Sequence, residues 1–258
     1  MDKLVVTSSN GIKRIVFNAP ERRNAVDAEM VERLLEVVLE TAGDDTRVLI
    51  LTGAGDAFCA GADVKGMLGR AGGFDVTEHL RRLTNPTIAA LREMPKPVIA
   101  RVHGPAVGIG CNYALAADIR IASTEARFGQ VFSKIGLIPD GGSTYLLPRL
   151  VGYAKAFELM VTGEVIDART AEALGLVTRV VEPEALDAAT EEWAARLSRG
   201  PGVAIGGIKK ALLYGETHSL AEALDFEAVT QAECFRSEDF REGVKAFVEK
   251  RRPAFRGC

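Results

Sequence analysis

Two glycine-rich turns in this sequence each place main-chain N–H groups where they could stabilise negative charge. In the first, an apolar run at Val98–Val102 precedes Gly104, Gly108 and Gly110, and the small apolar residues of 111–117 are typical of a buried helix. A strand, a glycine turn and a helix start in succession leave free N–H groups at one point, where the helix dipole favours an anion.

The second turn repeats this arrangement. An apolar run at Val48–Thr52 precedes Gly53, Gly55 and Gly61, and we expect a helix to begin near residues 62–63. Tight packing of a strand against a helix would explain one such cluster of glycines, but two clusters favour anion stabilisation. Two turns that face each other could hold one developing oxyanion between two N–H donors.

The glycines do not form a dinucleotide-binding fingerprint. A G-x-G-x-x-G pattern beginning at Gly108 would need glycine where the sequence has Tyr113, and one beginning at Gly104 would need glycine where it has Ala106. The sequence also has no G-x-x-x-x-G-K-[ST] loop and no G-x-S-x-G motif. We therefore reject a nicotinamide cofactor.

An α/β core with a helical C-terminal segment is expected to position these turns. The core covers residues 1–198 and the helical segment 199–258. The expected strands are Lys3–Thr7, Ile12–Asn18, Val48–Thr52, Val98–Val102, Asp118–Ala122 and Val177–Val181. The expected helices are 28–41 with Asp27 as N-cap, Glu78–Arg92, a helix capped by Ser143 that runs into Leu150, Tyr153–Thr162, Ala168–Leu174, Glu184–Ser198, Val203–Tyr214, Leu220–Phe235 and Asp239–Glu249. Residues 128–147 are expected to be loop-like, and the glycine-rich residues 66–73 to form a mobile loop.

Composition is ordinary for a cytoplasmic globular protein. The 258 residues are 47% hydrophobic and carry a formal net charge of −3, which implies no general attraction to nucleic acid or to an anionic membrane. No apolar run approaches the ~20 residues that a membrane span needs, and the first residues lack the apolar stretch of a signal peptide. The four cysteines lack the spacing of a zinc site, so we expect free thiols and no metal: Cys59, Cys111, Cys234 and Cys258.

Several motifs, in order along the chain, resemble those of the crotonase (enoyl-CoA hydratase/isomerase) superfamily from Leu4 to Phe255. They are PERRNAVDAEM, AFCAGADVKGM, HGPAVGIGCNYALAADIRIA, FGQVFSKIGLIPDGGSTYLLPRLVG and FVEKRRPAF. The resemblance implies a spiral of ββα units, a C-terminal trimerisation segment, homotrimers or dimers of trimers, and a coenzyme A thioester as substrate, with no separate cofactor. It also implies that the N–H groups of Ala62 and Ile109 polarise the thioester carbonyl.

The family's hydratases use two glutamates to place and activate water, and the matching positions here are Asn112 and Phe132. Neither side chain can transfer a proton near neutral pH, which argues against ordinary hydration. Asp140, in LIPDGGST, is another carboxylate in a region where two branches of the superfamily have an aspartate. These branches are the phenylacetate-pathway isomerase of ring-epoxidised thioesters, which FSKIGLIPDGGSTYLLPRL most resembles, and 4-chlorobenzoyl-CoA dehalogenase.

We expect Asp140 to be a general base and then an acid over an enolate held by the Ala62 and Ile109 N–H groups. One carboxylate suits the movement of a proton between two carbons, which is an isomerisation of a ring-epoxide, oxepin or Δ3–Δ2 enoyl thioester. A turn-forming role is the alternative for Asp140, because Gly141 and Gly142 follow it. An enoyl-CoA hydratase, a dehalogenase with Asp140 as nucleophile, and a non-catalytic acyl-CoA-binding scaffold remain as alternative functions.

The resemblance also implies a set of substrate-binding residues. Those expected along the coenzyme A or the acyl group are Asn24, Ala25, Val26, Ala60, Asp63, Val64, Asn112 and Phe132, joined by Phe247 and Lys250 of a neighbouring subunit. Asp63 has a second explanation as a negative charge at the start of the following helix. His103 and Cys111 are interpreted as packed structural residues.

Overall fold

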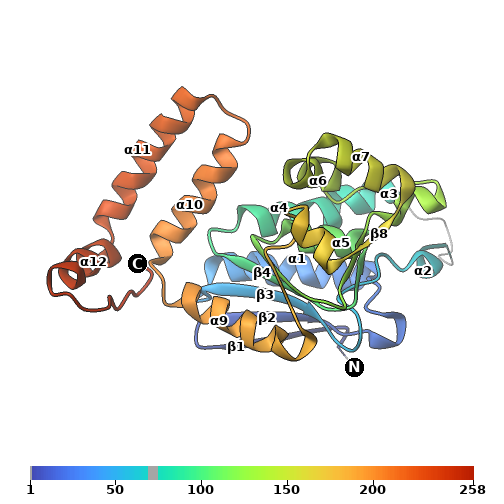
Figure 1. Ribbon diagram of the computed structural model, residues 1–258, viewed down its shortest axis with the longest axis horizontal. Helices are drawn as coiled ribbons and strands as arrows, with labels where there is room; N and C mark the ends of the chain where they lie inside the picture. Colours follow the sequence, from blue (N-terminus) through green and yellow to red (C-terminus); the bar gives the residue numbers. More distant parts are fainter. Residues whose placement is uncertain (1, 69–74) are drawn as a thin grey trace.

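The computed structural model describes residues 2–68 and 75–258, and a six-stranded sheet forms its centre (Figure 1). The strands in spatial order are β1 (Leu4–Ser9), β2 (Ile12–Phe17), β3 (Val48–Gly53), β4 (Val98–Val102), β6 (Ile119–Ser123) and β9 (Arg179–Val181). β1 and β2 form an antiparallel hairpin, and the pairs from β2 to β9 are parallel. The carboxyl ends of β3 and β4 therefore lie side by side at one edge of the sheet, and both glycine-rich turns leave from that edge.

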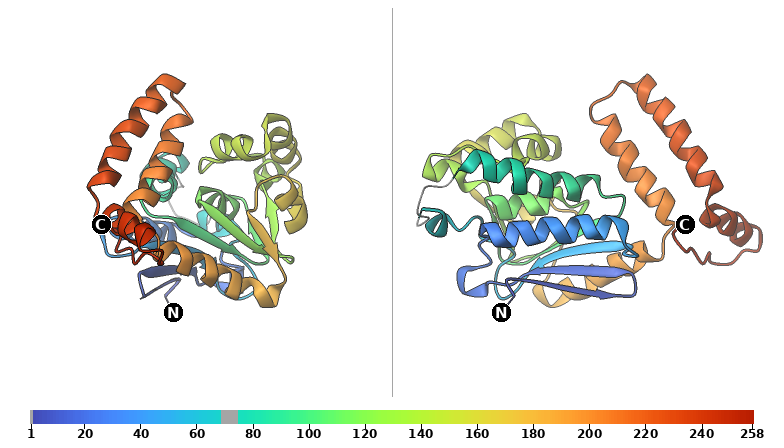
Figure 2. Two further views of the ribbon diagram at one scale, coloured as in Figure 1. Left: turned by 60° about the vertical axis from the view of Figure 1, so that its left-hand side comes forward. Right: turned by 180° about the vertical axis from the view of Figure 1, so that it is seen from behind.

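Helices cover both faces of this sheet. In β3, Leu49 and Leu51 point into one apolar cluster, which includes the buried face of α1 (Ala28–Gly43), whereas Val48 and Ile50 point into a second cluster with α9 (Leu186–Ser198). Figure 2 shows α1 and α9 on opposite faces of the strands. This two-sided burial explains why β3 reads as a continuous apolar run rather than an alternating one.

A second, three-stranded sheet was missed by the sequence analysis. It consists of β5 (Pro105–Val107), β7 (Arg127–Gly129) and β8 (Val165–Asp167). The expectation of a loop over 128–147 is wrong at both ends, because β7, the 3-10 helix η3 (Val131–Ile135) and α6 (Ser143–Val151) occupy much of it. Strands of three residues are too short to show a period of two in the sequence.

The other predicted helices and strands are present with ends shifted by a few residues. The remaining core elements are η1 (Pro20–Arg22), α2 (Val64–Leu68), α3 (Val76–His79), α4 (Asn85–Glu93), α5 (Ile109–Ala116), α7 (Tyr153–Thr162), α8 (Ala168–Ala173) and η4 (Pro183–Ala185). The helix expected at Glu78–Arg92 instead contains a π-helical turn, η2 (Leu80–Thr84), just before Pro86. Proline has no N–H to donate, so the α-helical hydrogen-bond ladder is interrupted there.

Three further expectations concern the loop at 66–73, membrane-spanning helices and the cysteines. Most of the expected mobile loop, residues 69–73, lies outside the described residues. Within the ranges that the structure describes, no helix is long and apolar enough to cross a membrane. The cysteines at 59, 111, 234 and 258 are free thiols, as predicted.

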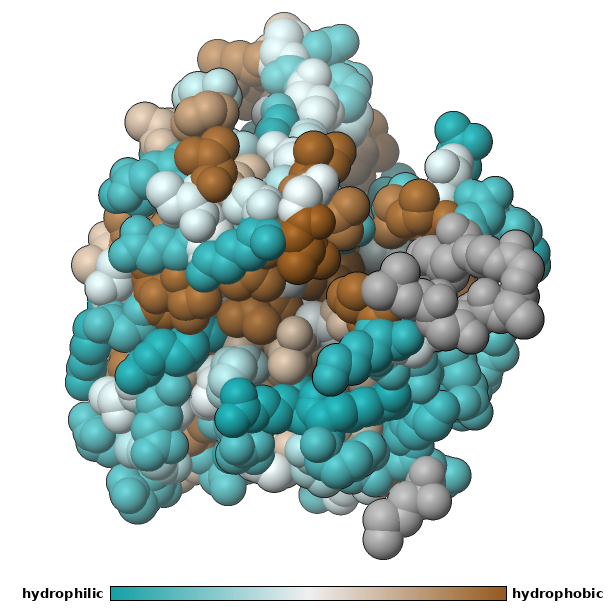
Figure 3. Space-filling model, turned by 90° about the vertical axis from the view of Figure 1, so that its right-hand side faces the viewer, coloured by the Kyte–Doolittle hydropathy of each residue, from teal (hydrophilic) through white to brown (hydrophobic). Residues whose placement is uncertain are grey.

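Apolar side chains reach the surface on the side of the molecule that carries α2 and α3, where Figure 3 shows apolar surface near the centre of the face. The segment formed by η3 and the residues after it also exposes Ile135, Leu137 and Ile138, and Ile138 is 80% exposed. This segment leads directly to Asp140.

Three C-terminal helices extend away from the core as an arm (Figures 1 and 2). They are α10 (Gly202–Gly215), α11 (Leu220–Arg236) and α12 (Glu238–Val248), so the expected division after residue 198 falls between α9 and α10. The arm exposes many large apolar side chains: Ile208, Leu212, Leu220, Leu224, Val229, Phe235, Phe240, Val244, Phe247 and Val248.

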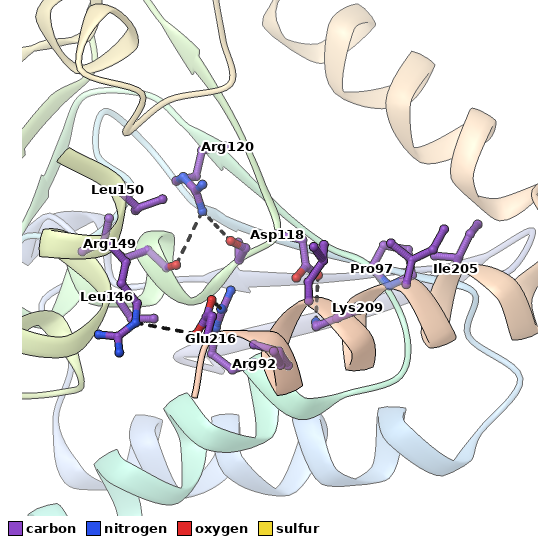
Figure 4. A pocket seen from close by; sticks show the side chains of 15 residues that line it. Arg92, Pro97, Asp118, Arg120, Leu146, Arg149, Leu150, Ile205, Lys209 and Glu216 are labelled. Carbon is purple, nitrogen blue, oxygen red and sulfur yellow. Dashed lines mark hydrogen bonds and ion pairs between the residues drawn. The ribbon is translucent and has the colours of Figure 1, made fainter. Parts of the chain in front are cut away.

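A buried lysine attaches the arm to the core. Lys209 Nζ donates to Asp118 Oδ2 at 2.7 Å and to the carbonyl of Leu91 at 3.0 Å, and burial lowers the pKa of this lysine. Figure 4 shows the Lys209–Asp118 pair at a cavity of about 460 Å³ between α10 and the core. In the same cavity Arg92 pairs with Glu216 at 3.2 Å.

We predict that Lys209→Ala destabilises the protein by about 3 kcal/mol, because the substitution leaves the Asp118 carboxylate without its partner in a largely buried place. Lys210→Ala is the matched control, since Lys210 is the next residue in α10 but is exposed. Urea denaturation of both variants checks this prediction. Equal stability of the two variants would contradict it.

Candidate active site

Hydrogen bonds between main-chain groups join the two glycine-rich turns. Cys59 N–H donates to the carbonyl of Pro105 at 3.0 Å, and Val107 N–H donates to the carbonyl of Cys59 at 3.1 Å. Gly110 packs so closely on this junction that a Cβ built there would lie 2.2 Å from the Cys59 oxygen. Glycine is therefore required at 110 for the approach of the two chains, not for a special backbone angle.

The two expected oxyanion donors lie on these joined turns. A Cβ built on Gly108 would be 3.7 Å from the Cα of Gly61, so the residues that precede Ala62 and Ile109 are neighbours in space. Within residues 2–68 and 75–258, neither the Ala62 N–H nor the Ile109 N–H donates to a protein acceptor. Two free donors thus sit on adjacent turns, as an oxyanion site requires.

The settings of these donors differ from each other. Ile109 is the first residue of α5, whose eight residues are all buried, and this matches the expected helix start. A helix, α2, also starts near 62–63 as expected, since it begins at Val64 and the Asp63 carboxyl accepts the Gly66 N–H, but Ala62 itself lies before this helix and forms a β-bridge with Val26. Val26 N–H donates to the Gly61 carbonyl, and this bond, rather than a helix, fixes the second donor.

Asp140 lies on a third turn that packs against α5. A Cβ built on Gly141 would lie 2.4 Å from Ile109 Cδ1 and 3.3 Å from Asn112 Nδ2. The chain therefore brings residues 140–141 into contact with the residue that carries one oxyanion donor. Burial raises the pKa of the Asp140 carboxyl, and no basic side chain within the described ranges pairs with it.

The main chain of Asp140 is held more firmly than its side chain. Its carbonyl accepts hydrogen bonds from Asn112 Nδ2 at 2.9 Å, Ser143 Oγ at 2.9 Å and Ser143 N–H at 3.1 Å. Ser143 is thus the first residue of α6. The N-cap position, where Ser143 was expected, is taken by Gly142. The turn-forming explanation for Asp140 holds for its backbone, whereas the carboxyl group makes no side-chain hydrogen bond to another described residue.

Asn112 and Phe132 occupy contrasting places. Asn112 is fully buried, and its Oδ1 accepts a hydrogen bond from Gln130 Nε2 at 2.8 Å. Phe132 is 8% exposed, and a Cβ built on Gly108 would lie 4.0 Å from the end of its ring. An apolar ring therefore stands beside the Ile109 donor turn.

The expected coenzyme A residues at 24–26 and 60–64 are brought together, but Asn24 is not available to a ligand. It is completely buried, its Oδ1 accepts from Ala19 N–H at 2.9 Å, and its Nδ2 donates to the carbonyls of Ala54 and Ala57 at 2.8 and 2.7 Å. Its side chain instead fixes the loop that ends at Ala60, whose N–H donates to the Arg23 carbonyl. Ala25 and Ala60 are half-buried, and Val64 is exposed.

Asp63 has the structural role that was its second explanation. Its Oδ1 accepts the Gly66 N–H at 3.0 Å, and its Oδ2 pairs with Arg22 Nη1 at 2.9 Å. Arg22 also pairs with Asp27 at 2.9 Å, and this contact, with that of Lys3, lowers the pKa of Asp27 to about 2 against the effect of burial. The carboxyl group of Asp63 is thus neutralised, unlike that of Asp140.

Phe247 and Lys250 lie far from these turns. They belong to the end of the arm, on the opposite side of the molecule from α2 (Figure 1), and Phe247 is 85% exposed. Within one chain they do not join the site, so their expected role concerns a neighbouring subunit only.

Two further side chains are structural, as expected. His103 is hydrogen-bonded to Arg101 and to the Gly55 carbonyl, and burial together with Arg101 lowers its pKa. Burial raises the pKa of the Cys111 thiol to about 12, so it is not a nucleophile at neutral pH.

Sequence analysis missed Gln130 and Arg22. Gln130 is 2% exposed; it lies within the motif FGQVFSKIGLIPDGGSTYLLPRLVG, but its place between β7 and η3 gives no hydrophobic period that would single it out. Arg22 stands in a charged loop, and only the fold shows that it reaches both Asp27 and Asp63.

Comparison with known proteins agrees with the geometry. Residues 7–258 match the enoyl-CoA hydratase/isomerase family. The chain is 40% identical over 260 residues to 1,2-epoxyphenylacetyl-CoA isomerase from Escherichia coli (strain K12), covering 100% of this chain and 99% of that protein. It is 41% identical over 249 residues to a "Probable enoyl-CoA hydratase" from Rhodobacter capsulatus, covering 96% of each. The crystal structure of an enoyl-CoA hydratase from Bacillus anthracis superimposes with a TM-score of 0.94 at 32% identity, covering 100% of both chains.

The fold is thus the crotonase fold, as expected, with its α/β spiral and C-terminal helices. The chain belongs to the enoyl-CoA hydratase/isomerase family and is an enzyme of the crotonase superfamily. Membership implies an acyl-CoA thioester as the class of substrate and either isomerisation or hydration as the class of reaction.

We predict that Gly110→Ala destabilises the protein by about 3 kcal/mol, because its methyl group would collide with the Cys59 carbonyl at the junction of the two turns. The matched control is Gly215→Ala at the end of α10, where an added Cβ would meet no atom within 4 Å. That variant should be as stable as the parent or up to about 1 kcal/mol more stable. Thermal denaturation distinguishes them, and a Gly110→Ala variant as stable as the control would disprove the steric argument.

Proposed function

We propose that this protein is an acyl-CoA isomerase in which Asp140 moves a proton between two carbons of the substrate. The observation that carries the proposal is a half-buried carboxyl without a cationic partner, on a turn that packs against the residue that carries the Ile109 donor. Because its pKa is raised, Asp140 is a stronger base than an ordinary aspartate once it is ionised.

The proposed reaction has two steps. The Asp140 carboxylate takes a proton from a carbon activated by the thioester, and the electron pair left behind delocalises onto the carbonyl oxygen between the Ala62 and Ile109 N–H groups. Asp140 then returns the proton to a different carbon, so that substrate and product are isomers. The N–H pair stabilises the charge that develops on oxygen, and loss of one such donor typically costs about 3 kcal/mol.

The surroundings of Asp140 support isomerisation over hydration. Asn112 and Phe132 stand where the family's hydratases are expected to have their glutamates, and neither can activate water. The Asn112 amide is already committed to Asp140 and Gln130. The ring of Phe132 beside Gly108 would exclude water from the space next to the Ile109 donor turn, where a hydratase must hold the water that adds to the double bond.

A ring-epoxidised or oxepin thioester is the acyl-CoA that we favour, with a Δ3–Δ2 enoyl-CoA as the second choice. In a ring-epoxide, the bond between the two epoxide carbons opens as the ring double bonds shift, which gives the oxepin, and Asp140 then moves the proton between two carbons of that oxepin. The support is the 40% identity to 1,2-epoxyphenylacetyl-CoA isomerase over the full chain. Proton transfer within the substrate needs no separate cofactor, and coenzyme A is part of the substrate.

We further propose that the protein acts as a homotrimer or a dimer of trimers in the cytoplasm. The exposed apolar side chains of the arm support this assembly, because isolated surfaces rarely expose so many. In the assembly, Phe247 and Lys250 would contact the adenine or phosphate end of a neighbour's coenzyme A.

We expect Asp140→Asn to lower the kcat of thioester isomerisation by about a thousandfold, since the amide cannot accept the proton. The affinity for the acyl-CoA should stay unchanged in calorimetry. Asp45→Asn, at an exposed site after α1, is the control and should retain full activity. Product analysis with a 3-enoyl-CoA, a ring-epoxide thioester and crotonyl-CoA tests the reaction class. Full activity of Asp140→Asn, or hydration of crotonyl-CoA as the main reaction of the parent, would refute the proposal.

The pH dependence should report the same group. Because the base works only when ionised, kcat/KM should fall as the pH decreases through the raised pKa of Asp140. The midpoint should therefore lie above the ordinary aspartate value of about 3.9. Phe132→Ala should admit water and move the midpoint down. A midpoint at or below the ordinary value in the parent protein would remove Asp140 as the titrating base.

A further inference from the structure

We propose that Gln130 is a positioning residue for Asp140 and acts through Asn112. The two amides form a chain of hydrogen bonds, from Gln130 Nε2 to Asn112 Oδ1 at 2.8 Å and from Asn112 Nδ2 to the Asp140 carbonyl at 2.9 Å. The inference rests on the proposed role of Asp140 and adds a residue that fixes where its carboxyl stands.

The direction of the chain is determined by chemistry. A peptide carbonyl can only accept a hydrogen bond, so Asn112 must turn its NH₂ group toward Asp140 and its oxygen toward Gln130. Gln130 must then present its own NH₂ group. Both amides are buried, at 0% and 2% exposure, so water cannot replace a donor that is removed.

The short segment that carries Gln130 also touches the oxyanion donors. The carbonyl of Gly129 accepts the Gly108 N–H at 2.9 Å, next to the Ile109 donor, while the following side chain reaches Asn112. Two residues later, Phe132 lies against Gly108. Residues 129–132 thus contact both the donor turn and, through Asn112, the turn of Asp140, and they set the distance between the two.

These two hydrogen bonds give the asparagine at position 112 a role of its own in the site. A carboxylate at 112, as the hydratases are expected to have, would place acceptor against acceptor at the Asp140 carbonyl, although it could still accept from Gln130 Nε2. An enzyme that uses Asp140 in this turn therefore needs an amide at 112. The Gln130 donor then binds the oxygen of that amide and holds its side chain in place.

The test compares Gln130→Leu, Asn112→Ala, the double variant and Asp140→Asn. Gln130→Leu should lower kcat for isomerisation between about tenfold and a hundredfold, because a small displacement of a catalytic group has effects of this size. The KM should change less than about twofold, since the substrate contacts are untouched. In the Asn112→Ala background, Gln130→Leu should have no further effect. Gln130→Glu, which has the same shape but no donor, should resemble Gln130→Leu.

Thr190→Val is the matched control for the loss of a buried hydrogen bond. Thr190 Oγ1 donates to the Leu186 carbonyl at 2.8 Å within α9, away from the site, so this variant should keep kcat unchanged. Thermal denaturation of each variant confirms that it is folded.

The outcomes separate the two proposals. An inactive Asp140→Asn with a fully active Gln130→Leu overturns the positioning role alone, and so does an additive loss in the double variant. An active Asp140→Asn overturns the proposed function. Amide hydrogen exchange then tests separately whether Gln130 holds the turn of Asp140. Exchange at Ser143 N–H, which bonds to the Asp140 carbonyl, should be faster in Gln130→Leu than in Thr190→Val. Equal exchange would show that Gln130 does not hold this turn.

Discussion

The parallel pairing of β3 with β4 is the constraint on which the rest of the site depends. Parallel neighbours release their chains at the same edge of a sheet, so the turns after Gly53 and Val102 start side by side. The bonds of Cys59 with Pro105 and Val107 then keep the turns together, and Gly110 allows the approach. The proposed pairing of the Ala62 and Ile109 N–H groups on one oxygen atom depends on this junction.

Sequence patterns predicted the parts of this arrangement that local chemistry determines. The apolar runs of β3 and β4, the buried α5 and the cap of α1 by Asp27 follow from hydrophobic patterning and from helix-end preferences. Gly61 and Gly108 indicated the two turns that carry Ala62 and Ile109. The helix start expected near 62–63 is present at Val64, whereas the β-bridge between Ala62 and Val26 just before it could not be read from the pattern.

The remainder depends on contacts between distant segments, which a single sequence does not display. Nothing local to Asn24 indicates that its side chain is saturated by Ala19 and the loop of Ala54 and Ala57, or that Gln130 reaches Asn112. The three-stranded sheet was equally hidden, because its strands are stabilised by their partners rather than by their own patterns. The resemblance to a family supplied the role of Asp140, and the fold supplied its neighbours.

The donors at Ala62 and Ile109 belong to the peptide backbone, and this has an evolutionary consequence. A point mutation that changes either side chain to anything but proline leaves the N–H group in place. In the proposed mechanism, the ability to polarise a carbonyl is thus inherited almost independently of the amino acids encoded there. Neighbouring positions such as 112, 132 and 140 are then free to diverge, and a lineage can exchange one reaction for another without first losing its hold on the thioester.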